Sequence, residues 1–239
     1  MKKSTPDYMV YGETGCTPPS VDIKQRAMIF WLKTSKSKDN SLPKICQNIL
    51  IDINEKENYI SPYTTYIKNN YNNSGLTSLF DTNTQHLINH NHINLIKQRT
   101  KDQYIQKWTE NKNNSPKALF YNIIKYDFGY EDYLDILNYR NRITLTKFRT
   151  CNHKLPIESG RYNNTPRIDR ICLTCRVLGD EFHSLYECTE FDECRKIFLK
   201  KHIYTHPNAY KTYNLFNNKS KTVLINLCQL IKIINIPLR

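Results

Sequence analysis

The chain has 239 residues, and its 35 lysines and arginines against 22 aspartates and glutamates give a formal net charge of +13 at pH 7. Hydrophobic residues make up 39% of the chain and the mean hydropathy is −0.66, which is typical of a water-soluble globular protein long enough to bury a core. No apolar run is long enough to cross a bilayer, and the first residues lack the apolar segment of a signal peptide. We therefore expect an intracellular protein, nuclear or cytoplasmic, with no membrane partner.

The positive charge favours an anionic partner such as RNA or DNA. It is concentrated in two stretches of the chain. Eight cations lie between Arg140 and Arg170 against two acids, Glu158 and Asp169, and no acid follows Cys194. An ordinary solvated surface rich in lysine would give a similar charge map, so this alternative stays open.

Hydrophobic periodicity predicts a mainly α-helical chain. The predicted helices cover residues 21–33, 42–55, 96–110, 116–126, 130–139, 142–149 and 182–202, with a last helix from about 219. Ser20 is the expected N-cap of the first helix, and the spacing of Ile45 and Ile49 places both in the core. Residues 69–75 are expected to form a loop, and residues 151–179 an irregular, turn-rich segment. The predicted fold is a helical bundle-like body with this small irregular segment set between helices.

The irregular segment contains the first members of a cluster of cysteine and histidine residues that has the spacing of a metal site. Cys172 and Cys175 are separated by two residues, and His183 and Cys188 follow at the start of the next predicted helix. Two cysteines at this spacing can place both thiolates on one tetrahedral ion, and the later pair completes the shell. Three thiolates and one imidazole leave no position for water, so the sequence predicts a zinc knuckle with one structural Zn²⁺ ion.

Two alternatives to this ligand set stay open. Cys194 lies six residues beyond Cys188 and would replace it if the helix began later. Cys151 and His153 lie upstream and could fold back onto the site. The other cysteines are interpreted as lone apolar thiols and the clustered histidines as a polar surface: Cys16, Cys46 and Cys228, and His86, His90 and His92.

The residues around the cluster resemble a known family. Residues 145–162 read LTKFRTCNHKLPIESGRY, and residues 170–188 read RICLTCRVLGDEFHSLYEC. This stretch resembles the zinc-binding region that follows the reverse transcriptase in LINE-type, non-LTR retrotransposon polyproteins of invertebrates. The resemblance is specific over about residues 140–200, and it implies that the four cysteine and histidine residues above are the zinc ligands.

The resemblance also implies a division of the chain. Residues 1–139 would be a helical connector region associated with the reverse transcriptase, residues 140–203 the zinc-binding region, and residues 204–239 a basic helical tail. Tyr11-Gly-Glu13 and Phe30-Trp31 are similar to the segment that joins polymerase to zinc region in such elements. In the parent polyprotein this module would bind template RNA or target DNA beside the polymerase body.

The chain departs from the family in one important respect. A reverse transcriptase needs paired aspartates to hold its two metal ions, and the nearest match, Tyr130-Glu131-Asp132-Tyr133, lacks the second adjacent aspartate. No phosphate-binding glycine loop, nucleophile elbow or metalloprotease helix is present either. The sequence therefore predicts no polymerase activity and no catalytic residues.

Two functions remain after this step. In the first, the zinc-stapled segment binds nucleic acid through cations that meet phosphates and through a stacking aromatic. The residues predicted for this role are Arg149, Lys154, Arg161, Arg167 and Arg170, with Tyr162, Phe182 or Tyr186 available to stack on bases. In the second, the zinc completes a structural or protein-interaction module. A retroelement fragment without a function of its own belongs to this alternative too. Arg161 would then pair with Glu158, Asp169 or Asp180.

Overall fold

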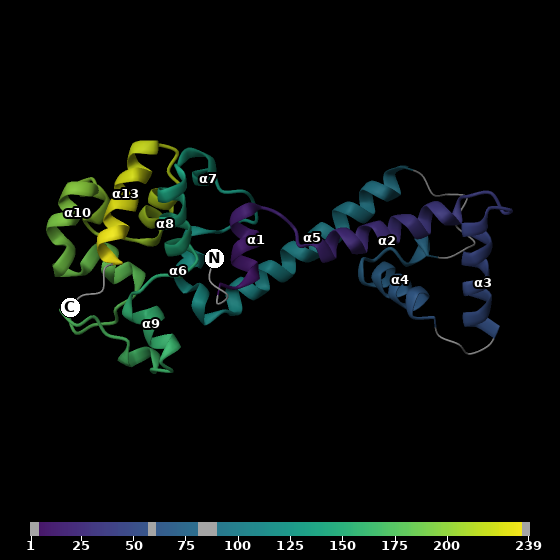
Figure 1. Ribbon diagram of the computed structural model, residues 1–239, viewed down its shortest axis with the longest axis horizontal. Helices are drawn as coiled ribbons and strands as arrows, with labels where there is room; N and C mark the ends of the chain where they lie inside the picture. Colours follow the sequence, from purple (N-terminus) through teal and green to yellow (C-terminus); the bar gives the residue numbers. More distant parts are fainter. Residues whose placement is uncertain (1–4, 57–60, 81–89, 236–239) are drawn as a thin grey trace. The chain divides into compact units, whose positions relative to one another are not determined.

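The computed structural model describes residues 5–56, 61–80 and 90–235 (Figure 1). These residues are mainly helical and contain no β-strand, only two isolated antiparallel bridges, Thr14 with Tyr130 and Ile171 with Leu178. The predicted mainly α-helical fold is therefore confirmed. Within these ranges no helix is both long enough and apolar enough to span a bilayer.

The chain forms two compact units. Unit 1 comprises Met1–Cys16 and Trp108–Arg239, and unit 2 comprises Thr17–Lys107. Unit 2 is thus inserted in sequence between two segments of unit 1. The predicted boundaries at 139/140 and 203/204 both fall inside unit 1, because the helices after residue 204 pack against helices that precede residue 150.

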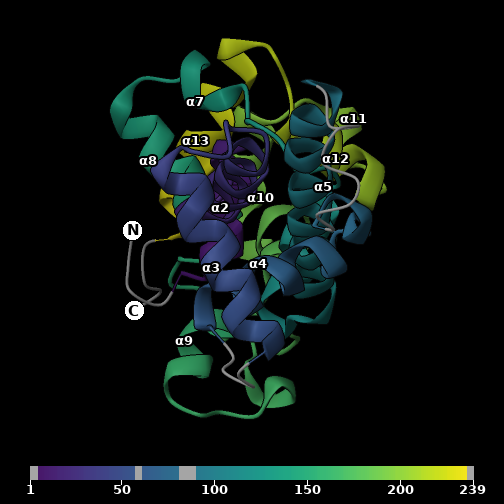
Figure 2. The same cartoon turned by 90° about the vertical axis from the view of Figure 1, so that its right-hand side faces the viewer.

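Unit 2 contains α2 (Pro19–Ser35), α3 (Leu42–Lys56), α4 (Pro62–Asn73), the 3₁₀ turn η1 (Thr77–Leu79) and most of α5 (His90–Asn114). Helix α2 packs against both α3 and α4 (Figure 2). The ring of Trp31 stacks on Phe80 with centroids 5.2 Å apart, and the Tyr71 hydroxyl donates to the Met28 carbonyl at 2.8 Å. The buried core consists of Met28, Trp31, Leu32, Ile67, Tyr71, Leu76, Leu79 and Ile96.

Two helix ends in unit 2 differ from the prediction. Helix α2 begins at Pro19, with Pro18 in extended conformation as its N-cap residue in place of Ser20. Proline suits the first helical position because it lacks the amide hydrogen that would be left unpaired there. The loop predicted over residues 69–75 begins only after Asn73, where α4 ends.

The stripe of isoleucines on α3 is not buried. Ile45 is 41% exposed and Ile49 is 51% exposed, so the prediction that they belong to the core is wrong. Helix α5 is longer than predicted at both ends. Its residue His92 is half-buried, whereas His86 and the side chain of His90 lie outside the described residues.

Unit 1 contains thirteen described helical segments and turns besides the end of α5. They are α1 (Asp7–Thr14), η3 (Pro116–Ala118), α6 (Leu119–Ile124), α7 (Tyr133–Ile136), α8 (Tyr139–Arg149), α9 (Pro156–Tyr162), η4 (Arg167–Asp169), η5 (His183–Glu187), η6 (Thr189–Phe191), α10 (Asp192–Phe198), α11 (Lys201–Tyr204), α12 (Ala209–Phe216) and α13 (Lys221–Ile234). Helix α13 packs against α8 and α10 (Figure 1). Helix α12 packs against α6.

Three aromatic rings from three of these helices form the centre of the core of unit 1. Phe120 lies edge-on to Phe148 at 5.7 Å and to Phe216 at 5.4 Å, and Phe148 stacks on Phe216 at 6.0 Å between centroids. Such aromatic pairs add about 0.5–1.5 kcal/mol each beyond the apolar area they bury. The three rings therefore join α6, α8 and α12 into one body.

Several predicted elements of unit 1 need correction. The segment 151–179, expected to be irregular, contains α9, which starts at Pro156. The single helix predicted over 182–202 is instead four short segments, because the backbone is extended at Cys188 and again at Leu199. Helix α12 was not predicted. The first of these breaks makes the chain turn a corner at Cys188, which is one of the predicted metal ligands.

A buried ion cluster joins α1 to α8. The guanidinium of Arg149 is fully buried, and its Nε lies 2.8 Å from Glu13 Oε2 and its Nη2 2.7 Å from Glu131 Oε2. The hydroxyl of Tyr133 donates to Glu13 Oε2 at 2.7 Å, and Arg149 Nη1 donates to the Phe216 carbonyl at 3.2 Å. Because the Arg149 side chain is fully buried and paired inside unit 1, it is removed from the predicted nucleic-acid interface.

Candidate metal centre

The first two cysteines of the cluster lie on a tight turn. The amide of Cys172 donates to the Val177 carbonyl at 2.7 Å, and the amide of Arg176 donates back to the Cys172 carbonyl at 2.9 Å. Arg176 closes the turn in the left-handed region, with φ of 58°, which is uncommon for a residue with a side chain. The turn holds Cys172 and Cys175 on the same side of the backbone loop.

The other two members lie at the two ends of a π-helical turn, η5, which begins at His183 and ends just before Cys188. The amide of Cys188 donates to the His183 carbonyl, five residues back, at 2.8 Å. The amide of His183 donates to the side chain of Asp180 at 2.9 Å, which fixes the start of this turn. Single π turns inside helices are rare and often occur at functional sites. Here the turn brings residues 183 and 188 to the same side as the first two cysteines.

The four side chains meet as the sequence predicted. One ligand atom from each of Cys172, Cys175, His183 and Cys188 lies within 4.8 Å of all the others. The Sγ atom of Cys188 is 3.8 Å from that of Cys172 and 3.8 Å from that of Cys175. Tetrahedral zinc with Zn–S bonds of about 2.3 Å requires sulfur atoms about 3.8 Å apart. The cluster therefore has the dimensions to hold a metal ion such as zinc.

The imidazole of His183 lacks the partners that burial normally requires. Both ring nitrogens of His183 are buried without a hydrogen bond, and its Nδ1 is 3.6 Å from Glu187 Oε2, beyond hydrogen-bond range. A buried imidazole with two unsatisfied nitrogens is costly. A metal ion bound at one nitrogen would remove the larger part of this cost.

Two of the thiols, Cys188 and Cys175, have shifted pKa values. Burial, together with the neighbouring Cys172 thiol, raises the pKa of Cys188 to about 12. Hydrogen bonding by Thr189 lowers the pKa of Cys175. Because metal binding requires the thiolate form, an ion would have to displace the proton of Cys188 on binding. A closed shell of three sulfurs and one nitrogen stabilises the fold and offers no position for a reactive water.

Arg195 on α10 supports the corner that carries Cys188, and sequence reasoning missed this role. Its Nη1 donates to the Leu185 carbonyl at 3.1 Å, and its Nη2 donates to the Cys188 carbonyl and to Asp192 Oδ1. The side chain is only 2% exposed. In the sequence, Arg195 stands at the start of the acid-free stretch that follows Cys194. The one sequence feature that indicated a partner for this arginine inside the chain was Asp192, three residues before it.

A second group of potential ligands, Cys151, His153 and Glu181, is buried nearby. The Nε2 atom of His153 lies 2.9 Å from Glu181 Oε1. A nitrogen and an oxygen bound to one tetrahedral zinc would be about 3.3 Å apart, given bond lengths of about 2.0–2.1 Å. The pair is therefore a direct hydrogen bond that ties residue 153 to the segment between the zinc-ligand pairs.

The structure excludes both alternatives to the predicted ligand set. Cys151 and His153 do not fold back onto the predicted site, because they are engaged with Glu181. Burial and the nearby Glu181 carboxylate raise the pKa of the Cys151 thiol well above its usual value. Cys194 is half-buried on α10 and belongs to neither group of ligands among the described residues. The set that includes Cys188 is the one that the fold assembles.

Two further arginines predicted to contact nucleic acid have partners in the chain. Arg170 Nε donates to the Thr165 carbonyl at 2.9 Å and its Nη1 to the Ile157 carbonyl at 3.0 Å. Its methylene groups lie against Gly160, where a Cβ atom would be 2.6 Å from Arg170 Cγ. Arg161 pairs with Glu158 at 3.1 Å, as the structural alternative predicted. Both arginines thus hold α9 and the turn that follows it.

The remaining predicted residues are accessible to different degrees. Lys154, Tyr162 and Arg167 are exposed, and Phe182 is half-buried. Tyr186 is only 5% exposed, so it is removed as a stacking residue. Fewer of the predicted residues are therefore accessible to nucleic acid than the sequence indicated.

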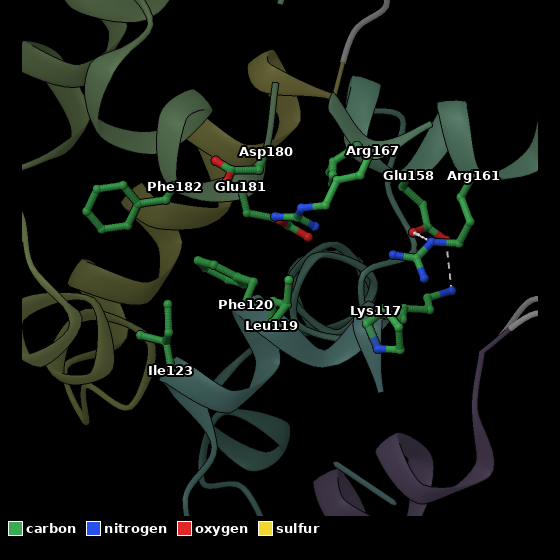
Figure 3. A pocket seen from close by; sticks show the side chains of 12 residues that line it. Lys117, Leu119, Phe120, Ile123, Glu158, Arg161, Arg167, Asp180, Glu181 and Phe182 are labelled. Carbon is green, nitrogen blue, oxygen red and sulfur yellow. Dashed lines mark ion pairs between the residues drawn. The ribbon is translucent and has the colours of Figure 1, made fainter. Parts of the chain in front are cut away.

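A small cavity of about 90 Å³ lies between η3, α6 and the segment that precedes His183 (Figure 3). Its charged lining residues are three cations and three acids: Lys117, Arg161 and Arg167, and Glu158, Asp180 and Glu181. Lys117 Nζ lies 2.8 Å from Glu158 Oε1, and the Arg167 side chain extends toward the acids at 180 and 181 (Figure 3). The charges compensate one another, so this cavity has no net preference for an anion.

Comparison with known proteins gives no match: no protein family, curated protein or solved structure matches this chain. The resemblance to the retrotransposon zinc-binding region therefore stays a prediction.

Proposed function

We propose that this chain is a zinc-stabilised, non-catalytic domain that binds nucleic acid, similar in role to the region that follows the reverse transcriptase in LINE-type retrotransposons. The observation that carries the proposal is the cluster of Cys172, Cys175, His183 and Cys188, whose sulfur spacing suits tetrahedral zinc. One zinc ion would join the turn at residue 172 to the corner at residue 188. Because ligand binding and folding are coupled in such sites, the ion would contribute directly to stability.

The charge of the chain supports nucleic acid as the partner. The formal net charge is +13, and several cations of unit 1 remain exposed after those used inside the fold are set aside. Exposed lysines and arginines bind phosphates and release condensed counterions, which gives affinity without sequence preference. The exposed cations are Arg140, Lys147, Lys154, Arg167, Arg176, Lys200, Lys201 and Lys221. Tyr162, which is 52% exposed, is the aromatic available for stacking.

A structural or protein-interaction module is the second candidate, and one observation favours it. Many cations of unit 1 serve the fold itself: Arg149, Arg161, Arg170 and Arg195 as described, Lys219 with Asp132 at 3.2 Å, and Lys196 with Glu193 at 2.6 Å. Fewer cations are therefore left to bind an anionic partner. The sequence lacks the paired aspartates that hold the metal ions of a polymerase. We therefore propose that, under either candidate function, the chain has no polymerase activity of its own.

Two measurements test the proposal. Metal analysis of protein purified without chelator should find one zinc per chain, and Cys175→Ser should abolish it while the control Cys194→Ser should not. Fluorescence anisotropy with a single-stranded oligonucleotide should show binding whose logarithm falls linearly with the logarithm of salt concentration. Zinc-loaded protein that binds no oligonucleotide at low salt would leave the structural module as the function.

A further inference from the structure

A second and larger cavity in unit 1 is lined by basic and polar side chains. Its volume is about 300 Å³, and it lies between the ends of α8 and α13 and the segment that follows α8. The lining residues are Thr144, Lys147, Asn152, His153, Lys154, Lys232 and Asn235. We propose that this cavity binds a phosphate group. The proposal rests on the function proposed above in one respect, namely that the phosphate belongs to a nucleic acid.

The charge of the lining carries the first step. Three lysines line the cavity, and the described residues of its lining include no carboxylate. The cavity of Figure 3 is different, because its cations are matched by equal numbers of acids. Three lysines that line one cavity carry like charges, and an anion with several oxygens would stabilise them. A phosphate group has the charge and the acceptors to satisfy them.

His153 carries the second step. The residue is 6% exposed, and its Nε2 is held by Glu181 at 2.9 Å. The residue lines the cavity, and its Nδ1 is buried without a hydrogen-bond partner. Buried polar atoms are nearly always paired, so an unpaired one at the wall of a polar cavity indicates a missing partner. A phosphate oxygen or its hydroxyl would supply that partner.

The lysines have a competing explanation in the helices themselves. Lys147 lies in the last turn of α8 and Lys232 in the last turn of α13, where a cation offsets the negative end of a helix dipole. Lys232 also donates to Asn141 Oδ1 at 2.9 Å. Lys154 belongs to neither helix, and the dipole gives no reason for its position. We therefore test the cavity with Lys147 and Lys154, which are both exposed.

The direct test uses inorganic phosphate and the zinc-loaded full chain in a phosphate-free buffer. Nitrogen-15 spectra of the histidine rings should show a saturable shift of the His153 Nδ1 signal, while the exposed His202 and His206 do not shift. The double variant Lys147→Gln/Lys154→Gln should lose the saturable response. A His153 signal that ignores phosphate, together with oligonucleotide binding that ignores the double variant, would overturn the proposal.

The second test identifies the source of the phosphate. Lys147→Gln/Lys154→Gln should lower oligonucleotide affinity and reduce the salt slope by about 1.4, since each lost contact with a single strand removes about 0.7. The control Lys36→Gln/Lys38→Gln removes the same charge from exposed residues of unit 2 and should leave both unchanged. Equal losses in the two variants would mean diffuse attraction and would overturn the cavity site. Zinc content and circular dichroism confirm that each variant is folded.

The two proposals can fail separately. If the wild-type chain binds no oligonucleotide but His153 responds to inorganic phosphate, the cavity site stands, its ligand is a free phosphate compound, and the nucleic-acid function fails. If the oligonucleotide binds, the cavity variant binds it as well as wild type and His153 does not respond to phosphate, the nucleic-acid function stands and the cavity site fails.

Discussion

Arg149 and Glu13 are 136 positions apart in sequence, yet the guanidinium Nε and the carboxylate Oε2 lie 2.8 Å apart in the interior of unit 1. Glu131 binds the same guanidinium at 2.7 Å, so one cation faces two carboxylates. The arginine side chain is fully buried. A cation that the sequence suggested for nucleic acid is instead the link between α1 and α8.

Removing one partner of this cluster should destabilise the fold strongly. Glu13→Gln leaves a buried guanidinium with less compensating charge, and loss of one partner from a buried ion pair costs about 3–5 kcal/mol. Chemical denaturation monitored through Trp108, which belongs to unit 1, measures the change. The control Glu193→Gln breaks an exposed pair and should change stability little. Similar unfolding midpoints for the two variants would contradict the structural role of the cluster.

Arg195 should affect zinc affinity without contacting the ion. Arg195→Gln removes the donors to the Leu185 and Cys188 carbonyls, so the ligand corner loses its support. Loss of such outer-shell partners lowers metal affinity about 10- to 100-fold. Competition with a chromophoric chelator measures the zinc dissociation constant. Lys196→Gln, at the adjacent exposed position, should bind zinc as wild type does, and an equal effect of both changes would refute the mechanism.

The cysteines should divide into three classes of alkylation rate at pH 8. Cys16 and Cys46 are exposed and should react first. Burial raises the pKa of Cys228 to about 12, so at pH 8 it remains an unreactive thiol rather than a nucleophilic thiolate. The three cysteines of the metal centre should be protected with zinc present and react after chelation. Peptide mass spectrometry after short iodoacetamide pulses resolves the classes, and rapid labelling of Cys228 in folded protein would contradict its burial.

Two glycines with the same backbone conformation should differ in their tolerance of a side chain. Gly15 and Gly75 have φ of 64° and 65°, which disfavours alanine at either position by about 1–2 kcal/mol. At Gly15 a Cβ atom would also lie 2.8 Å from the Gly129 carbonyl carbon, whereas at Gly75 it would meet open space. Gly15→Ala should therefore cost more than Gly75→Ala. Denaturation followed by Trp108 for the first and Trp31 for the second gives the comparison, and equal costs would exclude the contact with residue 129.

The metal centre could be predicted from the sequence because its members are close together in the chain. Cys172 and Cys188 are only 16 positions apart, and the spacing of thiols with one imidazole restricts the chemistry. The helical class was also predictable, because apolar residues recur with the helical period. The π turn at His183 was not, because the apolar pattern continues through Cys188 without a break.

The role of each arginine could not be predicted in the same way. Sequence records that Arg149 is a cation, but its use depends on which carboxylate the fold brings to it. Glu13 is too far away in the chain for any local pattern to indicate the pair. Arg170 is held by backbone carbonyls, which every residue possesses and which leave no signature. A basic stretch therefore predicts an excess of charge, whereas its accessible part follows only from packing.

The insertion of unit 2 between the two segments of unit 1 sets an order of events during protein synthesis. At ribosomal rates of about 5–20 residues per second, Arg149 is made roughly 7–27 s after Glu13. All of Thr17–Lys107 leaves the ribosome within that interval and already contains every residue of its own core. Glu13 stays hydrated throughout, since the cation that neutralises it does not yet exist. Helix α1 is therefore translated before unit 2 but takes its final place after it.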